Sequence, residues 1–143
     1  MANPLSRFQL TSRTREKKIE YFDYIQKLTP IGDYVKIENI DVIINSWNNI
    51  LLTPRGTYDH DPRYGSSLFD LIFQPADIDT QNLIREEIYN SVYYYDNRAS
   101  INNITVTYLR GNSTKKGYNV QIDVEYNGEI KTLTLDVTSS QGL

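Results

Sequence analysis

The first clear hydrophobic pattern in the chain spans residues 39–52, where large apolar residues recur every three to four positions. This repeat predicts an amphipathic α-helix with one apolar face. The residues on that face are Ile40, Ile43, Ile44, Trp47 and Leu51. Asn39 suits the N-cap position. Thr53-Pro54 ends the helix, because a residue before proline avoids helical backbone angles.

Two further helical patterns follow a polar loop. A short helix is predicted at 66–73, and a longer one at 78–94, with Asp77 or Asp79 as its N-cap. The apolar residues of the short helix are Leu68, Phe69, Ile72 and Phe73. Those on the inner face of the long helix are Leu83, Ile84, Ile88 and Val92.

The end of the 78–94 helix carries aromatic residues that cannot all lie on one stripe. They are Tyr89, Tyr93, Tyr94 and Tyr95. The whole chain has 12 Tyr beside 4 Phe and 1 Trp, and tyrosine is enriched at protein interfaces. We therefore expect some of these rings to contact another element or a partner chain.

Beyond residue 100 the pattern changes to an alternation of apolar and polar residues, which is typical of half-buried strands. Three strands are predicted within 100–138, the last two at 118–126 and 129–138. They are joined by Asn127-Gly128, a strong signal for a two-residue hairpin turn. Because the helices precede the strands, the sequence predicts a single α+β domain. Two main helices and a short helix pack on a three-stranded antiparallel meander, whose edge strands can accept a strand from another protein.

The predicted domain, 19–138, is flanked by two short segments. Residues 1–18 carry five basic residues and one acidic residue, which predicts a mobile basic arm. Residues 139–143 are predicted to form a loose tail. Within 19–37 we predict a short strand at 34–37 and order against the domain or against a neighbour.

Composition narrows the class of protein. The chain has 143 residues, 39% hydrophobic and 23% charged, and no cysteine, which fits one ordinary globular domain without disulfides. A net charge of −3 does not indicate a nucleic-acid partner. No apolar run is long enough for a membrane helix, and the N-terminus lacks a signal-peptide core, so the expected location is the cytoplasm where the chain is made, or an assembly built there.

Polar residues of the central loop are the main candidates for chemistry. Asp59-His60-Asp61 could form a metal or acid–base site, but the chain has no second histidine and no thiolate. A polar loop without a metal or cofactor is the favoured interpretation, and no catalytic motif is present. Arginines stand at three element junctions, where planar bidentate pairing is expected. They are Arg55, Arg63 and Arg98.

Two segments of this loop resemble a family signature. Residues 50–56 read ILLTPRG and residues 61–68 read DPRYGSSL. They are similar to the small wedge proteins of contractile-tail baseplates, the sheath-initiator or "lysozyme-like" family, which also includes a baseplate subunit of type VI secretion systems. Members often carry Glu-Pro-Arg after the second long helix. Here Asp96-Asn97-Arg98 keeps the acid and the arginine without the rigid turn that proline gives.

The resemblance implies a structural, non-enzymatic role in a virion tail baseplate. Its expected partners are the core-bundle proteins of the wedge, the tail sheath protein and neighbouring small baseplate proteins. No nucleic acid or membrane is expected as a partner. The implied task is to dock on the core bundle around the tail tube and to template the first sheath ring through strand pairing with the C-terminal sheet. The expected partner-binding residues are Arg63, Asp96, Arg98, Tyr94, Tyr95, Leu133 and Leu135.

Two alternatives stay open at this point. One is a baseplate-associated cell-wall hydrolase that uses carboxylates such as Asp70 and Glu86. The other is the equivalent subunit of a bacterial contractile injection or type VI secretion system.

Overall fold

The computed structural model describes residues 18–27, 30, 32, 34–110 and 116–139. The predicted arm, apart from Lys18, and residues 140–143 of the predicted tail lie outside the described residues. The elements, in chain order, are β1 (Phe22–Ile25), β2 (Val35–Glu38), α1 (Ile40–Leu52), α2 (Leu68–Leu71), α3 (Ile78–Tyr95), β3 (Ser100–Arg110), β4 (Lys116–Tyr126) and β5 (Glu129–Thr138). No described helix has the length and apolar character needed to cross a membrane.

The C-terminal half forms the predicted three-stranded antiparallel meander, in the order β3-β4-β5. A two-residue turn joins β4 to β5 at Asn127 and Gly128, whose φ angles are 50° and 79°. Both positions therefore adopt the left-handed backbone that the Asn-Gly pair tolerates. Tyr126 pairs with Glu129 across the turn, which sets the register of the whole ladder.

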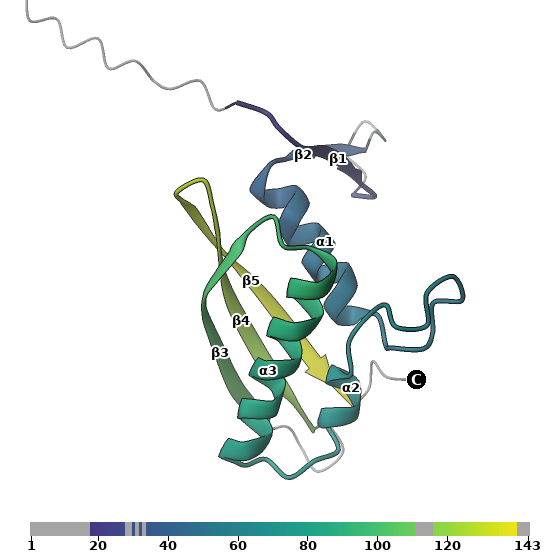
Figure 1. The fold of residues 1–143 in the computed structure, drawn as a ribbon, viewed down its shortest axis with the longest axis vertical. Coiled ribbons are helices and arrows are strands. Elements are labelled where there is room, and N and C mark those ends of the chain that lie inside the picture. The colour runs from purple at the N-terminus through teal and green to yellow at the C-terminus, as the bar shows by residue number, and fades with distance from the viewer. Residues whose placement is uncertain (1–17, 28–29, 31, 33, 111–115, 140–143) are drawn as a thin grey trace, which may run out of the picture.

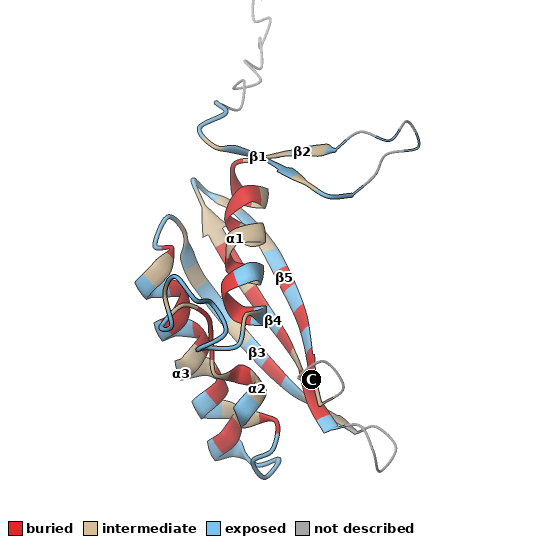
Figure 2. Ribbon diagram, turned by 90° about the vertical axis from the view of Figure 1, so that its right-hand side faces the viewer, coloured by how far each residue is buried: buried red, intermediate tan, exposed pale blue. Residues whose placement is uncertain are grey.

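The three helices cover one face of this sheet, so the domain has two layers (Figure 1). Buried residues alternate with more exposed ones along β4 and β5, and they appear as bands on these strands in Figure 2. The predicted α+β architecture is confirmed. The buried core includes Ile43, Trp47 and Leu51 of α1, Ile84, Ile88 and Val92 of α3, and Val106, Val120, Ile122, Val124, Leu133, Leu135 and Val137 of the sheet.

The start of α1 differs from the prediction. Asn39 precedes the helix with φ 50°, and its side chain makes no capping hydrogen bond. Its Oδ1 instead accepts hydrogen bonds from the backbone N–H groups of Glu20 (2.8 Å) and Tyr21 (3.2 Å). Its Nδ2 donates to the carbonyl of Lys18 at 2.9 Å. Asn39 therefore occupies the predicted N-cap position, but its side chain does not cap the helix, because this amide holds the preceding segment against the domain.

The other two helices were predicted with small errors. Asp77 caps α3 by accepting a hydrogen bond from the Thr80 N–H at 2.8 Å. Leu83, predicted to lie on the inner face, is 50% exposed, because the buried stripe through Ile84 and Ile88 leaves it on the flank of the helix. The helix predicted at 66–73 is confined to α2, and Phe73 beyond it is 76% exposed.

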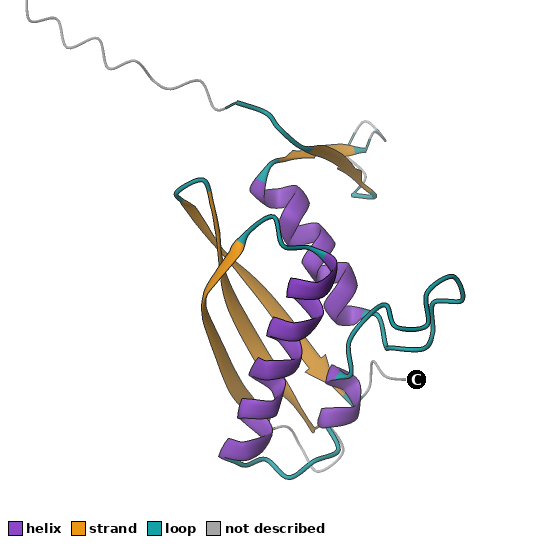
Figure 3. Cartoon of the chain, viewed as in Figure 1, coloured by secondary structure: helices purple, strands orange, loops and turns teal. Residues whose placement is uncertain are grey.

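A small second sheet lies at the N-terminal end of α1 (Figure 3). The strand predicted at 34–37 is present as β2, which pairs antiparallel with β1. β1 itself was not predicted as a strand, because Phe22-Asp23-Tyr24-Ile25 lies between unpatterned residues. Phe22 and Tyr24 are exposed on one face of this hairpin.

Candidate protein-interaction site

The loop between α1 and α2, residues 53–67, is closed at its base. The Ser66 N–H donates to the Thr53 carbonyl at 2.9 Å, and the Arg55 N–H donates to the Ser66 carbonyl at 3.0 Å. The Ser66 hydroxyl donates to the carbonyl of Leu51, in the last turn of α1, at 2.6 Å. Gly65 crosses this base with φ 104°. The segment is therefore a compact surface loop whose two ends lie close together, and loops of this form are frequently functional.

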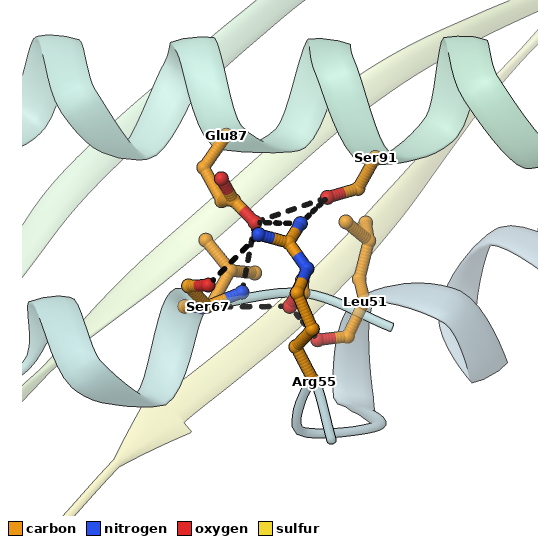
Figure 4. A network of polar contacts seen from close by, with 7 residues as sticks. Leu51, Arg55, Ser67, Glu87 and Ser91 are labelled. Carbon is orange, nitrogen blue, oxygen red and sulfur yellow. Dashed lines mark hydrogen bonds and ion pairs between the residues drawn. The ribbon is translucent and has the colours of Figure 1, made fainter. Parts of the chain in front are cut away.

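Glu87 of α3 fastens the loop to the helices, as Figure 4 shows. Its Oε1 accepts hydrogen bonds from Arg55 Nη2 (2.8 Å), from the Ser67 N–H (2.8 Å) and from the Ser91 hydroxyl (3.1 Å). Arg55 also donates to the Ser67 hydroxyl at 3.2 Å. The pairing expected for Arg55 is present. Its partner Glu87 was not identified in the sequence, because the two are 32 residues apart and Glu87 looks like any exposed helical acid.

Aromatic rings form a second connection between the loop and α3. Ring centroids are 5.4 Å apart for Tyr58 and Tyr64, 5.1 Å for Tyr64 and Tyr95, and 4.8 Å for Tyr95 and Tyr94. The Tyr95 hydroxyl donates to Asp61 Oδ2 at 3.3 Å. This contact engages the Asp59-His60-Asp61 segment. Among the described residues, no group of three or more His, Cys, Asp or Glu side chains could hold a metal.

The loop and α3 enclose a cavity of about 350 Å³. It brings together three of the residues predicted to bind a partner, namely Arg63, Tyr94 and Tyr95. Arg55, Asn90 and Ser91 complete the lining. Tyr94 is exposed, and the Arg63 guanidinium has no hydrogen bond or ion pair to any described residue.

Asp96 and Arg98 form a different site, at the end of α3. Arg98 holds the Asp96 carboxylate with two hydrogen bonds, Nε to Oδ1 at 2.7 Å and Nη2 to Oδ2 at 2.6 Å. Its guanidinium also lies 5.1 Å from the ring centre of Tyr21. The Asp96 carbonyl accepts a hydrogen bond from Trp47 Nε1 at 3.2 Å. These contacts join α1, α3 and the segment before β1.

The structure therefore divides the roles expected for Asp96 and Arg98. Asp96 is 6% exposed and its carboxylate is bonded to Arg98 within the chain, while its expected contact with a partner stays a prediction. Arg98 is partly exposed and can still offer its remaining N–H groups.

The surroundings of Asp96 predict how stability depends on pH. Burial acts most strongly and raises its pKa, but hydrogen bonds from Arg98 and Ser46 and the charge of Arg98 outweigh it, so the pKa lies below its ordinary value. A depressed folded-state pKa adds stability above the unfolded-state pKa of about 3.9, and this is lost as pH falls through the folded-state pKa.

We expect Asp96→Asn to lower the free energy of unfolding by about 1–3 kcal/mol at pH 7, because it removes a charged hydrogen-bond acceptor. The difference from the wild type should begin to shrink as pH falls below the unfolded-state pKa of about 3.9, and it should keep shrinking until pH has passed the lower folded-state pKa, where the folded wild-type carboxyl is protonated too. Urea unfolding at a series of pH values measures both effects. If the difference in free energy of unfolding between the two proteins stays constant down to pH 2, the ionised Asp96 carboxylate is not the source of the stabilisation.

Leu133 and Leu135 lie in the core, where they are 6% and 3% exposed. They alternate along β5 with exposed polar residues, so they face the helices. Their side chains are covered by this chain itself, so a partner that contacts β5 can reach its backbone and its outward-facing side chains but not these two leucines.

The free edge of β5 presents backbone groups in a regular order. Tyr126 and Glu129 flank a two-residue turn and so form a hydrogen-bonded pair, after which bonded and non-bonded pairs alternate. The N–H and C=O groups of Ile130, Thr132, Thr134 and Asp136 therefore point away from β4. Among the described residues, β5 pairs with β4 alone.

The opposite edge, β3, is partly occupied. Arg85 of α3 donates from Nε to the Ile104 carbonyl at 3.3 Å, and this carbonyl lies on the side of β3 away from β4. The two edges of the sheet are thus unequal. Arg85 was not identified in the sequence, because nothing in its pattern shows that α3 lies beside this edge.

The carboxylates considered for a hydrolase, Asp70 and Glu86, line one surface pocket with Leu71 and Leu83. Both carboxylates are exposed to solvent. A catalytic acid with a raised pKa needs an apolar enclosure, which these exposed side chains lack.

Comparison with known proteins gives one family. The sequence profile of the family described as baseplate wedge protein gp25 matches residues 39–131, which is more than half of the chain. No curated protein matches the chain in sequence.

Solved structures show the same fold. A chain in the baseplate of the anti-feeding prophage has a TM-score of 0.62 and 17% identity, over 77% of this chain and 87% of the other. A candidate tail lysozyme from Geobacter sulfurreducens has a TM-score of 0.55 and 19% identity, over 68% and 86%. A chain in the post-contraction baseplate of pyocin R2 has a TM-score of 0.52 and 16% identity, over 82% and 97%.

Proposed function

Because this chain belongs to the gp25 family of baseplate wedge proteins, we propose that it docks on the wedge core bundle around the tail tube and templates the tail sheath. The family is a structural component of contractile baseplates. The proposed partners are the wedge core-bundle proteins, the sheath protein and neighbouring small baseplate proteins. The proposed location is the tail baseplate of the particle, assembled in the host cytoplasm.

The observation that carries the proposal is the free edge of β5. Four of its residues direct outward backbone groups that pair with no described strand, while its core face is already covered by α1 and α2. An extended segment of the sheath protein can add to this edge as a fourth strand, with main-chain hydrogen bonds providing affinity. Arg85 partly occupies the β3 edge, so strand addition is directed to β5.

Docking on the core bundle is assigned to the end of α3, which lies at the end of the sheet where β3 and β5 begin. Arg98 lies where α3 meets the sheet, and its partner Asp96 is buried against Trp47. A guanidinium held in this way is pre-oriented, so little side-chain entropy is lost when it binds a second acceptor.

The first test is co-expression of this chain with the wedge-core and sheath proteins of the same particle. Copurification with the core proteins supports docking, and copurification with the sheath protein supports templating. Recovery of the chain with neither would refute the proposal.

We expect Thr134→Pro to abolish copurification with the sheath protein and to leave binding to the core proteins unchanged. The Thr134 N–H points to the free edge, so proline removes a donor that only an added strand would use. Because no bond within the domain is lost, the free energy of unfolding should change by less than about 1 kcal/mol. Pull-down assays and urea unfolding measure the two quantities.

Thr134→Ala is the matched control, because it removes the same side chain and keeps the N–H. It should bind the sheath protein as the wild type does. If the alanine and proline variants bind equally well, strand pairing at this edge is not the mode of contact.

A further inference from the structure

The 53–67 loop is held in place mainly by contacts with the rest of the domain, since it has no regular secondary structure of its own. It has no helix or strand, yet it is held by the bonds at its base, by Glu87 and by the row of tyrosines described above. Loops of this length without secondary structure are uncommon in small domains and are usually functional. The ordering fixes the position of Arg63, which stands near the end of the loop.

The cavity beside Arg63 is lined by positively charged, neutral polar and aromatic groups. Its lining contains two arginines, one amide, one hydroxyl and two tyrosine rings, and no carboxylate. Arg55 is neutralised by Glu87 at 2.8 Å, whereas Arg63 has no ion-pair partner among the described residues. The nearby Asp61 carboxylate accepts hydrogen bonds from the Arg63 backbone N–H and the Tyr95 hydroxyl. The cavity therefore offers one guanidinium without an ion pair among the described residues, beside two tyrosine rings, and this favours a carboxylate ligand.

An acidic surface lies directly beside this cavity. The neighbouring pocket shares Asn90 with it and is lined by Asp70, Glu86 and Glu87. Neither Asp70 nor Glu86 has an ion-pair partner among the described residues. One face of α3 thus presents a positive pocket next to a negative one.

We propose that the Arg63 cavity binds the side-chain carboxylate of an acidic segment in a neighbouring baseplate protein, with a basic residue of the same segment placed over Asp70 and Glu86. The assignment of the partner to the baseplate rests on the proposed function. The paired charges would fix the orientation of the segment along α3, because like charges meet if it is reversed.

The same charges disfavour a nucleic-acid ligand. A phosphate backbone carries a continuous row of negative charges, and the acidic pocket would repel it beside the single free arginine. A protein segment with alternating charges has no such conflict.

The first experiment tests the cavity alone, by NMR of the isotope-labelled chain at low salt. The probe is an acetylated and amidated hexapeptide of alternating Glu and Lys, which carries both charges of the proposed segment, and the same peptide with Gln in place of Glu is the control without carboxylates. We expect the glutamate peptide alone to shift the resonances of Arg63 Nε–H, the Asn90 side-chain amide and the Tyr94 ring.

Arg63→Gln should weaken this binding about tenfold or more, the effect of losing roughly 1.4 kcal/mol of charge pairing. Its fold should be unaffected, because the side chain makes no polar contact with the described residues. Lys36→Gln is the matched control, since it removes one positive charge from the exposed β1–β2 hairpin and should leave the shifts in place. Equal binding by Arg63→Gln would overturn the proposal. So would tighter binding of an oligothymidylate at the same resonances.

The second experiment tests the partner, with Arg63→Glu in the co-expression assay. We expect loss of one core or small baseplate protein, with restoration when an acidic residue of that protein is changed to lysine. Normal assembly of the variant would overturn the partner assignment and leave the proposed function standing. Failure of the wild type to assemble would refute the proposed function, while the peptide titration would still decide the chemistry of the cavity.

Discussion

Replacing Trp47 by alanine is expected to lower the free energy of unfolding by about 3–5 kcal/mol. Trp47 is fully buried between α1, α3 and the sheet. Its removal leaves a large cavity and deprives the Asp96 carbonyl of the indole N–H donor at 3.2 Å. Domains of this size are stable by only about 5–15 kcal/mol, so the variant should be close to unfolding at physiological temperature.

Trp47→Phe separates the two contributions. Phenylalanine restores much of the packing but not the donor, so we expect a loss nearer to 1–3 kcal/mol, about the cost of an unsatisfied buried acceptor. Urea unfolding followed by circular dichroism measures both variants, because the chain has no other tryptophan to report by fluorescence. If alanine costs less than about 1 kcal/mol, Trp47 does not belong to the core described above.

Gly65→Ala is expected to destabilise the protein by about 3 kcal/mol or more. The added Cβ would lie 2.2 Å from the Thr53 carbonyl oxygen, a backbone atom that cannot rotate away. The backbone must open where the Ser66 N–H bonds to that same carbonyl. A φ of 104° adds strain of about 1–3 kcal/mol for any residue with a side chain.

Gly56→Ala is the matched control in the same loop. Gly56 also has a positive φ, 89°, but nothing lies within 4 Å of an added Cβ. It should cost only the conformational strain, about 1–2 kcal/mol. The difference between the two urea midpoints isolates the clash at the loop base. Equal losses would mean that Thr53 and Gly65 are not in close contact.

The secondary structure was largely predictable, because its signals are local. The apolar spacing in 39–52 and the alternation after residue 100 depend on neighbours a few positions apart. Asn127-Gly128 determines its own turn for the same reason. The strand β1 was missed, because a short exposed strand depends on its pairing with β2 more than on any pattern of its own.

The composition of the candidate sites was only partly predictable. The family motif and the element junctions drew attention to Arg63, Tyr94, Tyr95 and Arg98. Glu87, which holds the loop in place, carried no such signal. The side-chain partners of Asn39 and Asp96 within the chain were not predicted, because a polar side chain at the end of a helix can bond to any segment that passes near it.

The sequence alone thus determined the elements of this protein except β1, their order and the resemblance to its family, since these follow from local periodicity and from a short motif. Only the tertiary structure decided which backbone edges and which charged side chains remain available to a partner. Packing turned Leu133 and Leu135 inward and left the β5 backbone open, while Arg85 partly occupied the β3 edge. Pairing neutralised Arg55 and Asp96 but not Arg63. Such outcomes depend on distances between residues far apart in the chain, and local sequence patterns do not encode those distances.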